Sequence, residues 1–200
     1  MITRREVIGS GLAVSMLART SVASVSSADS QANWLPVPYF VADERFGAAH
    51  EASHAAAGSG AAIMTFPGDV TALYESLDLA WRSARFAVSG MTTTAALFVL
   101  ERLAWERGLR TAYRGVHRPT SEGSMRHELA GSSELLRRLA GEHDSHWASR
   151  VGRELAWWSP AKASGGEATL LSQMLPCAHR ATLVSWLLTP KDDRARTARK

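Results

Sequence analysis

Between residues 39 and 115, short apolar runs alternate three times with longer segments that have the apolar periodicity of helices. The apolar runs indicate strands at 39–42, 61–66, 85–89 and 109–114. The segments between them indicate helices at 47–57, 70–81 and 93–107, and the second has apolar residues at 70, 73, 77 and 81 on one face. Strands separated by helices of about 10–15 residues are typical of βαβ units. The sequence therefore predicts an α/β fold with a mostly parallel sheet.

The chain after residue 115 has weaker periodicity. It predicts additional C-terminal helices at 132–140 and 143–157. Residues 182–188 predict a late strand, although the same apolar run also fits a helix. No linker divides the chain, so we expect a single domain over 39–190, preceded by a polar linker at 29–38 and followed by a basic, disordered tail at 191–200.

The charges of this 200-residue chain are concentrated at its two ends. The whole chain has 23 basic and 19 acidic side chains, but residues 29–190 alone contain 15 basic and 16 acidic ones. Proteins that bind nucleic acids neutralise phosphates with clustered Lys and Arg, so a near-neutral body argues against nucleic-acid binding. The single cysteine, Cys177, excludes an internal disulfide and any four-cysteine metal site.

The N-terminus combines paired arginines with a moderately apolar stretch. Arg4 and Arg5 follow Thr3 and precede an apolar run at 7–18, and small residues follow at 26–28. This arrangement resembles a twin-arginine (Tat) export signal with a cleavage site after Ala28 or, as the alternative, after Ala32. The resemblance implies recognition by the Tat translocase and a periplasmic location. An uncleaved membrane anchor is the alternative, but spanning a bilayer takes about 20 apolar residues, so we expect no stable membrane span after cleavage.

The Tat resemblance also implies a partner. That route carries cargo that is already folded, often because a cofactor or a partner has to be loaded in the cytoplasm. The chain has neither a Rossmann glycine pattern nor a haem-attachment motif, so we expect no cofactor of its own. Two alternatives remain at this point: the protein folds quickly by itself, or it is exported together with a cofactor-bearing redox partner.

Several short segments resemble a group of small, uncharacterised bacterial proteins that carry Tat signals. The resemblance lies in less than half of the chain, at 43–46, 68–71, 90–92, 97–98 and 100–104. It supports the α/β prediction and implies no known activity.

One motif suggests metal chemistry. His50, Glu51 and His54 form an H-E-x-x-H sequence, which on a helix places two imidazoles on one face to hold zinc while the glutamate activates a water molecule. Glu75 lies at a spacing where some zinc peptidases have a third ligand. Those peptidases form much of their sheet before the motif, whereas here few residues precede it. A solvated helix face is the simpler interpretation.

The ends of the predicted strands suggest a binding site. In open α/β sheets, ligands bind beyond the carboxyl ends of the strands, and a glycine turn before a helix exposes N–H groups that bind anions. The candidate ligand-binding residues at these ends are Asp43, Arg45, Asp69, Thr71, Gly90, Thr92, Thr93, Arg114 and His117. Helix capping and a local ion pair are the structural alternative for the same residues.

We therefore expect an exported, single-domain binding or accessory protein, with enzymatic activity less expected than binding. A small zinc-dependent hydrolase that uses His50, Glu51 and His54 is one alternative. A small-molecule-binding domain that uses the strand-end residues without any partner is another.

Overall fold

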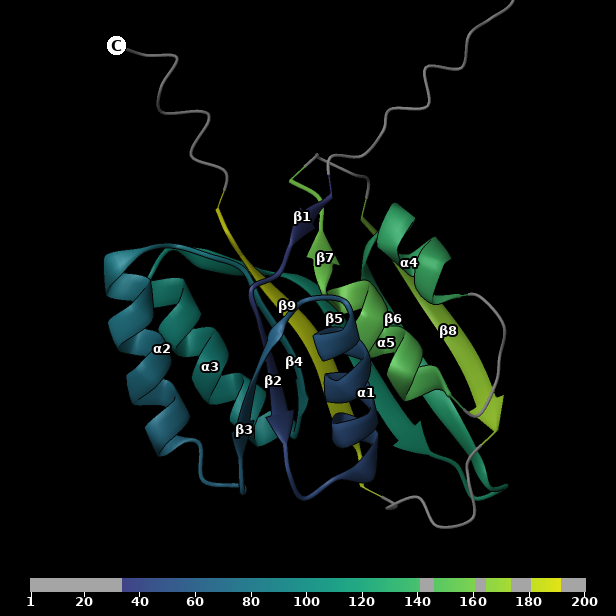
Figure 1. Ribbon diagram of the computed structural model, residues 1–200. Helices are drawn as coiled ribbons and strands as arrows, with labels where there is room; N and C mark the ends of the chain where they lie inside the picture. Colours follow the sequence, from purple (N-terminus) through teal and green to yellow (C-terminus); the bar gives the residue numbers. More distant parts are fainter. Residues whose placement is uncertain (1–33, 141–145, 161–164, 174–180, 192–200) are drawn as a thin grey trace, which may run out of the picture. The chain divides into compact units, whose positions relative to one another are not determined.

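The computed structural model describes residues 34–140, 146–160, 165–173 and 181–191 (Figure 1). The predicted signal peptide with Arg4 and Arg5, linker residues 29–33 and tail residues 192–200 lie outside the described residues. All described residues belong to one compact unit, Ala32–Lys200. Across these ranges, no helix has both the length and the apolar character needed to cross a membrane.

The described residues form helices and strands in an irregular order. The helices are α1 (Gly47–Gly58), α2 (Thr71–Ser83), α3 (Thr94–Glu106), α4 (Ser133–Leu139) and α5 (Trp147–Leu155). The strands are β1 (Leu35–Pro36), β2 (Tyr39–Asp43), β3 (Ala62–Phe66), β4 (Val88–Thr92), β5 (Leu109–Pro119), β6 (Ser124–Ser132), β7 (Trp157–Trp158), β8 (Gly165–Gln173) and β9 (Leu183–Pro190).

The main sheet has seven strands in the order β3-β2-β4-β9-β5-β6-β8. Strand β2 pairs in parallel with β3 and β4, and every other pairing in this sheet is antiparallel. The predicted mostly parallel sheet is therefore wrong. The βαβ pattern holds only for the segment from β2 to β4, and the alternative between strand and helix at 182–188 is resolved as strand β9.

The late strand β9 is the reason for this difference. It inserts between β4 and β5 and runs antiparallel to both, with Gly90 opposite Trp186 in one pairing and Arg114 opposite Trp186 in the other. The hairpin of β5 and β6 and the edge strand β8 then extend the sheet in antiparallel pairings. A short turn joins β5 and β6, but the other antiparallel pairings join strands that are distant in the sequence. The helix-strand alternation at 39–115 does not reveal these pairings.

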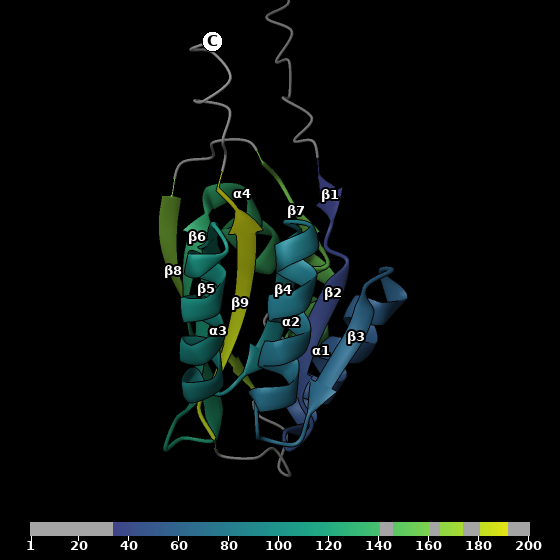
Figure 2. The same cartoon turned by 90° about the vertical axis from the view of Figure 1, so that its left-hand side faces the viewer.

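Two layers of helices cover the sheet. Helices α1, α4 and α5 lie on one face and α2 and α3 on the other, as the two views show (Figures 1 and 2). Side chains on alternate positions of each strand enter the two cores: Phe40 packs with α1 and α5, and Val41 packs with α2 and α3. Strand β4, between the two layers, is buried at every position.

A two-stranded ribbon lies beside one end of this sheet. Strands β1 and β7 pair antiparallel, with Leu35 opposite Trp158, and the N–H of Val37 donates to the carbonyl of Ala156 at 2.8 Å. The ribbon holds Trp34 and Trp158 next to the start of β5, where the candidate site lies.

Candidate functional site

The first predicted residues, Asp43 and Arg45, form an ion pair with each other. The Asp43 carboxylate is fully buried, and it accepts hydrogen bonds from Nε of Arg45 at 2.9 Å and from Nη2 at 2.7 Å. These bonds raise the pKa of the Arg45 guanidinium above its ordinary value. The guanidinium lies against Gly68, where a Cβ atom would be 2.7 Å from Cζ of Arg45. The ion pair gives both residues a structural role.

Asp69 and Thr71 form a local turn at the start of α2. Oδ1 of Asp69 accepts hydrogen bonds from the backbone N–H of Thr71 at 2.9 Å and from its hydroxyl at 2.7 Å. The backbone hydrogen bond, followed by the hydroxyl one, holds the pKa of Asp69 below its usual value. Both side chains are exposed, and their hydrogen bonds are local to this turn.

Gly90, Thr92 and Thr93 are occupied by internal contacts. A Cβ atom on Gly90 would lie 2.6 Å from the indole of Trp186, so the glycine makes room for that ring. The Trp186 indole N–H donates to Oγ1 of Thr92 at 3.0 Å, and this hydroxyl donates to the carbonyl of Thr93. Oγ1 of Thr93 accepts from the N–H of Ala96 and caps α3. Packing and capping account for these three residues.

Arg114 and His117 lie on opposite faces of β5. Arg114 approaches Glu101 of α3 at 3.8 Å, whereas His117 is buried on the side of α5. The predicted strand-end residues thus form separate contacts and do not converge on one point. That they bind a ligand stays a prediction.

The H-E-x-x-H residues lie on α1, with both imidazoles exposed to solvent. Glu51 points elsewhere and accepts a hydrogen bond from the Ser149 hydroxyl at 2.6 Å. Glu75 belongs to α2, which covers the other face of the sheet, so it does not join His50 and His54. Within the described ranges, no group of three or more His, Cys, Asp or Glu side chains is arranged to hold a metal ion.

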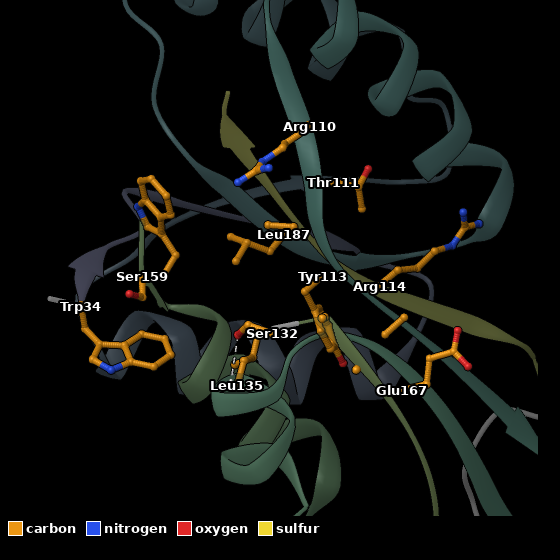
Figure 3. Close-up of a pocket in the computed structure, with 16 residues that line it drawn as sticks. Trp34, Arg110, Thr111, Tyr113, Arg114, Ser132, Leu135, Ser159, Glu167 and Leu187 are labelled. Carbon is orange, nitrogen blue, oxygen red and sulfur yellow. Dashed lines mark hydrogen bonds between the residues drawn. The ribbon is translucent and has the colours of Figure 1, made fainter. Parts of the chain in front are cut away.

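A large, open cavity of about 1000 Å³ lies where β5 begins and β6 ends (Figure 3). Its lining comes from β5, β6, α4, β9, the ribbon with its flanking residues, and the start of β8. It comprises Trp34, Arg110, Thr111, Ala112, Tyr113, Arg114, Ala130, Gly131, Ser132, Leu135, Trp158, Ser159, Gly165, Gly166, Glu167 and Leu187. We call it the open cavity. Only Arg114 of the sequence-predicted residues lines it.

A β-bulge between Thr111 and Tyr113 shapes this cavity. Because the bulge inserts one residue, Ala112 and Tyr113 both face the side of α4 and α5. Thr111 and Arg114 face the other side, where the Thr111 hydroxyl donates to Glu101 at 2.8 Å. The sequence pattern at 109–114 predicts a strand, and a bulge leaves no clear periodic signal.

The open cavity combines apolar surface with charged side chains, of which Arg110 and Arg114 are cations. In Figure 3 the Arg110 guanidinium is turned toward Leu187, and Arg114 extends away from the centre. Arg110 is exposed, and among the described residues it has no ion-pair partner. The Trp34 ring is held in place by the Arg138 guanidinium, whose Cζ lies 4.4 Å from the ring centroid. An anionic group beside Arg110 and an apolar body between the aromatic rings would fit this surface.

A second polar group is buried under α5. A chain of hydrogen bonds joins the hydroxyls of Tyr113 and Ser185 at 3.1 Å, Ser185 Oγ and His117 Nε2 at 2.7 Å, the Nδ1 atoms of His117 and His127 at 2.7 Å, and His127 Nε2 and Ser172 Oγ at 2.8 Å. We call these five side chains the histidine chain. All five are buried.

The environment of the histidine chain favours neutral side chains. Burial, followed by the charge of the neighbouring His127, lowers the pKa of His117 well below its ordinary value. Burial also raises the pKa of Tyr113, an effect that its hydrogen bond with Ser185 partly offsets. Of this group, sequence reasoning found only His117. The inward alternation of Met125, His127 and Leu129 in β6 was the available signal.

Comparison with protein-family models, with curated proteins and with solved structures finds no match to this chain.

Proposed function

We propose that this protein is exported to the periplasm by the Tat route and acts there as a binding or accessory protein through the open cavity. The observation that carries the binding role is the cavity itself, whose volume of about 1000 Å³ suits a small-molecule ligand. Aromatic walls with a few polar groups are the common composition of such sites.

The charge in the open cavity favours an anionic ligand. Arg110 supplies a guanidinium that forms paired hydrogen bonds with carboxylates and phosphates, and Trp34 and Trp158 supply flat apolar surface. Glu167 lies on the opposite side of the cavity from Trp34 and disfavours an anion there, which orients the ligand (Figure 3).

The accessory role has separate support. It follows from the twin-arginine pattern around Arg4 and Arg5, which is typical of cargo exported in a folded state, and the partner we propose is a co-exported, cofactor-bearing redox protein.

Calorimetric titration with three probes of similar shape tests the binding role. The probes are 2-naphthoate, 2-naphthylmethanol and 2-naphthylmethylamine, which are negative, neutral and positive. We expect 2-naphthoate to bind most tightly. The change Arg110→Gln weakens that binding about tenfold or more, since a hydrogen bond to a charged group contributes about 1.5–3 kcal/mol.

The matched control is Arg102→Gln. Arg102 is an exposed arginine on α3 that stacks on Phe98 and Trp105, on the other side of the sheet. We expect this variant to bind 2-naphthoate as the wild type does. Equal affinity for the three probes, no binding of any probe, or equal losses in the two variants would each contradict the proposal.

A further inference from the structure

A second, much smaller cavity lies beside the histidine chain. Its volume is about 30 Å³, and it shares no lining residue with the open cavity. His117, His127 and Ser172 line it together with Trp147 and Arg150, and leucines and a valine complete the wall. Polar, titratable groups thus meet an apolar hollow at a place that the proposed binding role does not use.

The order of the groups is that of an activated serine. Ser172 Oγ lies 2.8 Å from Nε2 of His127, and Nδ1 of His127 lies 2.7 Å from Nδ1 of His117. A nucleophile within hydrogen-bond reach of a base, with the base oriented by a third group, is the arrangement of nucleophilic hydrolases. Ser172 is 6% exposed and His117 is 1% exposed, so the serine is at the end nearer to solvent.

The protons can be placed to activate Ser172. When His127 carries its proton on Nδ1, it donates to Nδ1 of His117, and its Nε2 accepts from the Ser172 hydroxyl. Neutral His117 then carries its proton on Nε2 and donates to Ser185. The reversed set of hydrogen bonds fits the same distances and has His127 donating to Ser172. To convert one set into the other, the proton of each hydrogen bond in the histidine chain moves to the other atom of that bond.

The surroundings fix the rings and supply charge. The Trp147 ring packs on both imidazoles, with centroid distances of 4.5 Å to His117 and 4.7 Å to His127. Leu139 and Leu170 offer apolar contact for a short acyl chain. Arg150 also lines this cavity, and a nearby cation stabilises the oxygen that becomes negative during attack on a carbonyl.

We propose that Ser172, His127 and His117 form a hydrolytic site for esters of short-chain carboxylic acids. Ser172 Oγ forms a bond to the carbonyl carbon as its proton moves to Nε2 of His127. The intermediate then breaks its bond to the leaving oxygen, which takes that proton and departs as an alcohol. Water repeats both steps on the acyl-serine, which releases the carboxylic acid and restores Ser172. His117 acts through His127 and is a positioning residue.

Covalent labelling of the native protein tests this site. The probe is a methyl fluorophosphonate, and peptide mass spectrometry locates the label. We expect one label per chain at Ser172, and no label there in Ser172→Ala or in heat-denatured protein. We also expect the native protein to hydrolyse p-nitrophenyl acetate and Ser172→Ala to lose this activity. His127→Gln should slow labelling roughly 10²- to 10⁴-fold. The matched control is Thr169→Ala, which removes an exposed hydroxyl from the same strand and keeps the wild-type rate.

The wild-type protein alone can overturn the proposal. If folded wild type takes no label, or takes it at another residue, Ser172 is not a nucleophile. Labelling of His127→Gln at the wild-type rate would show that His127 does not activate Ser172, which also contradicts the proposal. The pH profile tests His117: the labelling rate rises with pH to a plateau, and His117→Asn shifts the midpoint. An unchanged midpoint contradicts the positioning role. Naphthoate titration concerns the other cavity, so the two proposals fail separately.

Discussion

A Cβ atom on Gly152 of α5 would lie 1.9 Å from the carbonyl oxygen of Ala52 in α1, so only glycine fits at this helix crossing. Ala52 is fully buried there, and Ala148 on α5 is nearly so. Small side chains let the two helix backbones approach closely, and α5 in turn carries Trp147 over the histidine chain.

Gly152→Ala should destabilise the protein by about 1–3 kcal/mol, because the added methyl group has no space between the two backbones. Gly58→Ala is the matched control, since Gly58 is also helical and a Cβ atom there meets nothing within 4 Å. We expect the control to leave stability unchanged or to raise it by up to about 1 kcal/mol. Urea unfolding of the three proteins measures the difference, and equal midpoints for both variants would contradict the close contact.

Arg45→Ala should lower the melting temperature more than Arg118→Ala does. Removing Arg45 deprives the fully buried Asp43 carboxylate of its charged partner, and an uncompensated buried charge is costly. In the control, Arg118 pairs with Glu128 and both side chains are about half exposed, so little is lost. The strand-end binding hypothesis expects the opposite: an unchanged melting temperature and loss of ligand capture. Thermal melts of both variants separate the two.

Acid should destabilise the folded protein through His117. Its folded pKa is lowered, so below the ordinary value of 6.5 the unfolded chain takes up a proton that the folded protein excludes. The free energy of unfolding is therefore not reduced by His117 above about pH 7. It falls with decreasing pH by up to about 1.4 kcal/mol per pH unit until the pKa of His117 in the folded protein is reached.

Urea unfolding near pH 7.5 and pH 5.5 measures this effect. The exposed His54 provides the control, because His54→Gln should keep the wild-type pH dependence and His117→Asn should reduce it. A wild-type stability that is equal at the two pH values would show that the buried imidazole is not excluded from protonation.

The purified protein should contain no stoichiometric zinc. His50 and His54 are separated from Glu75 by the sheet, so the predicted third ligand does not reach the two imidazoles. Elemental analysis after dialysis tests this. One zinc ion per chain that is lost in both His50→Ala and His54→Ala would restore the zinc hydrolase as the better hypothesis.

Replacement of both Arg4 and Arg5 by Lys should retain the precursor in the cytoplasm, because the Tat translocase requires the paired arginines. Cell fractionation followed by immunoblotting measures the mature protein in the periplasm. The control is replacement of Arg19, which follows the apolar stretch, by Lys. Normal processing of the Arg4, Arg5 double variant would contradict the Tat assignment.

The sequence predicted local elements well. The helices expected at 70–81 and 93–107 are α2 at Thr71–Ser83 and α3 at Thr94–Glu106, and the expected strand at 182–188 is β9. Strands β1, β6, β7 and β8 were not predicted; β1 lies in the expected linker 29–38, and β7 begins inside the expected helix 143–157. In β6, small residues at 130–132 (Ala, Gly and Ser) end the alternation, and β8 begins with two glycines and has exposed residues along its edge.

The candidate sites were less predictable than the elements. Arg110, Trp34 and Trp158 meet because a bulge in β5 and a ribbon of β1 with β7 bring them together. In the histidine chain, Ser185 lies 68 residues from His117 along the sequence and Ser172 lies 45 from His127. Spacing along the sequence gave no indication of either neighbour.

The sequence by itself determined the elements whose apolar periodicity is clear, such as α2 and α3, and which of their positions face a core, because apolar periodicity is a property of each segment alone. The tertiary structure decided which strand pairs with which, and in which direction. An apolar strand such as β9 buries the same side chains whether it runs parallel or antiparallel to β4, so its periodicity cannot specify direction. Direction and order depend on hydrogen bonds and packing between distant segments. These contacts place His127 beside His117, and they bring Arg110 and the two tryptophans to the walls of one cavity.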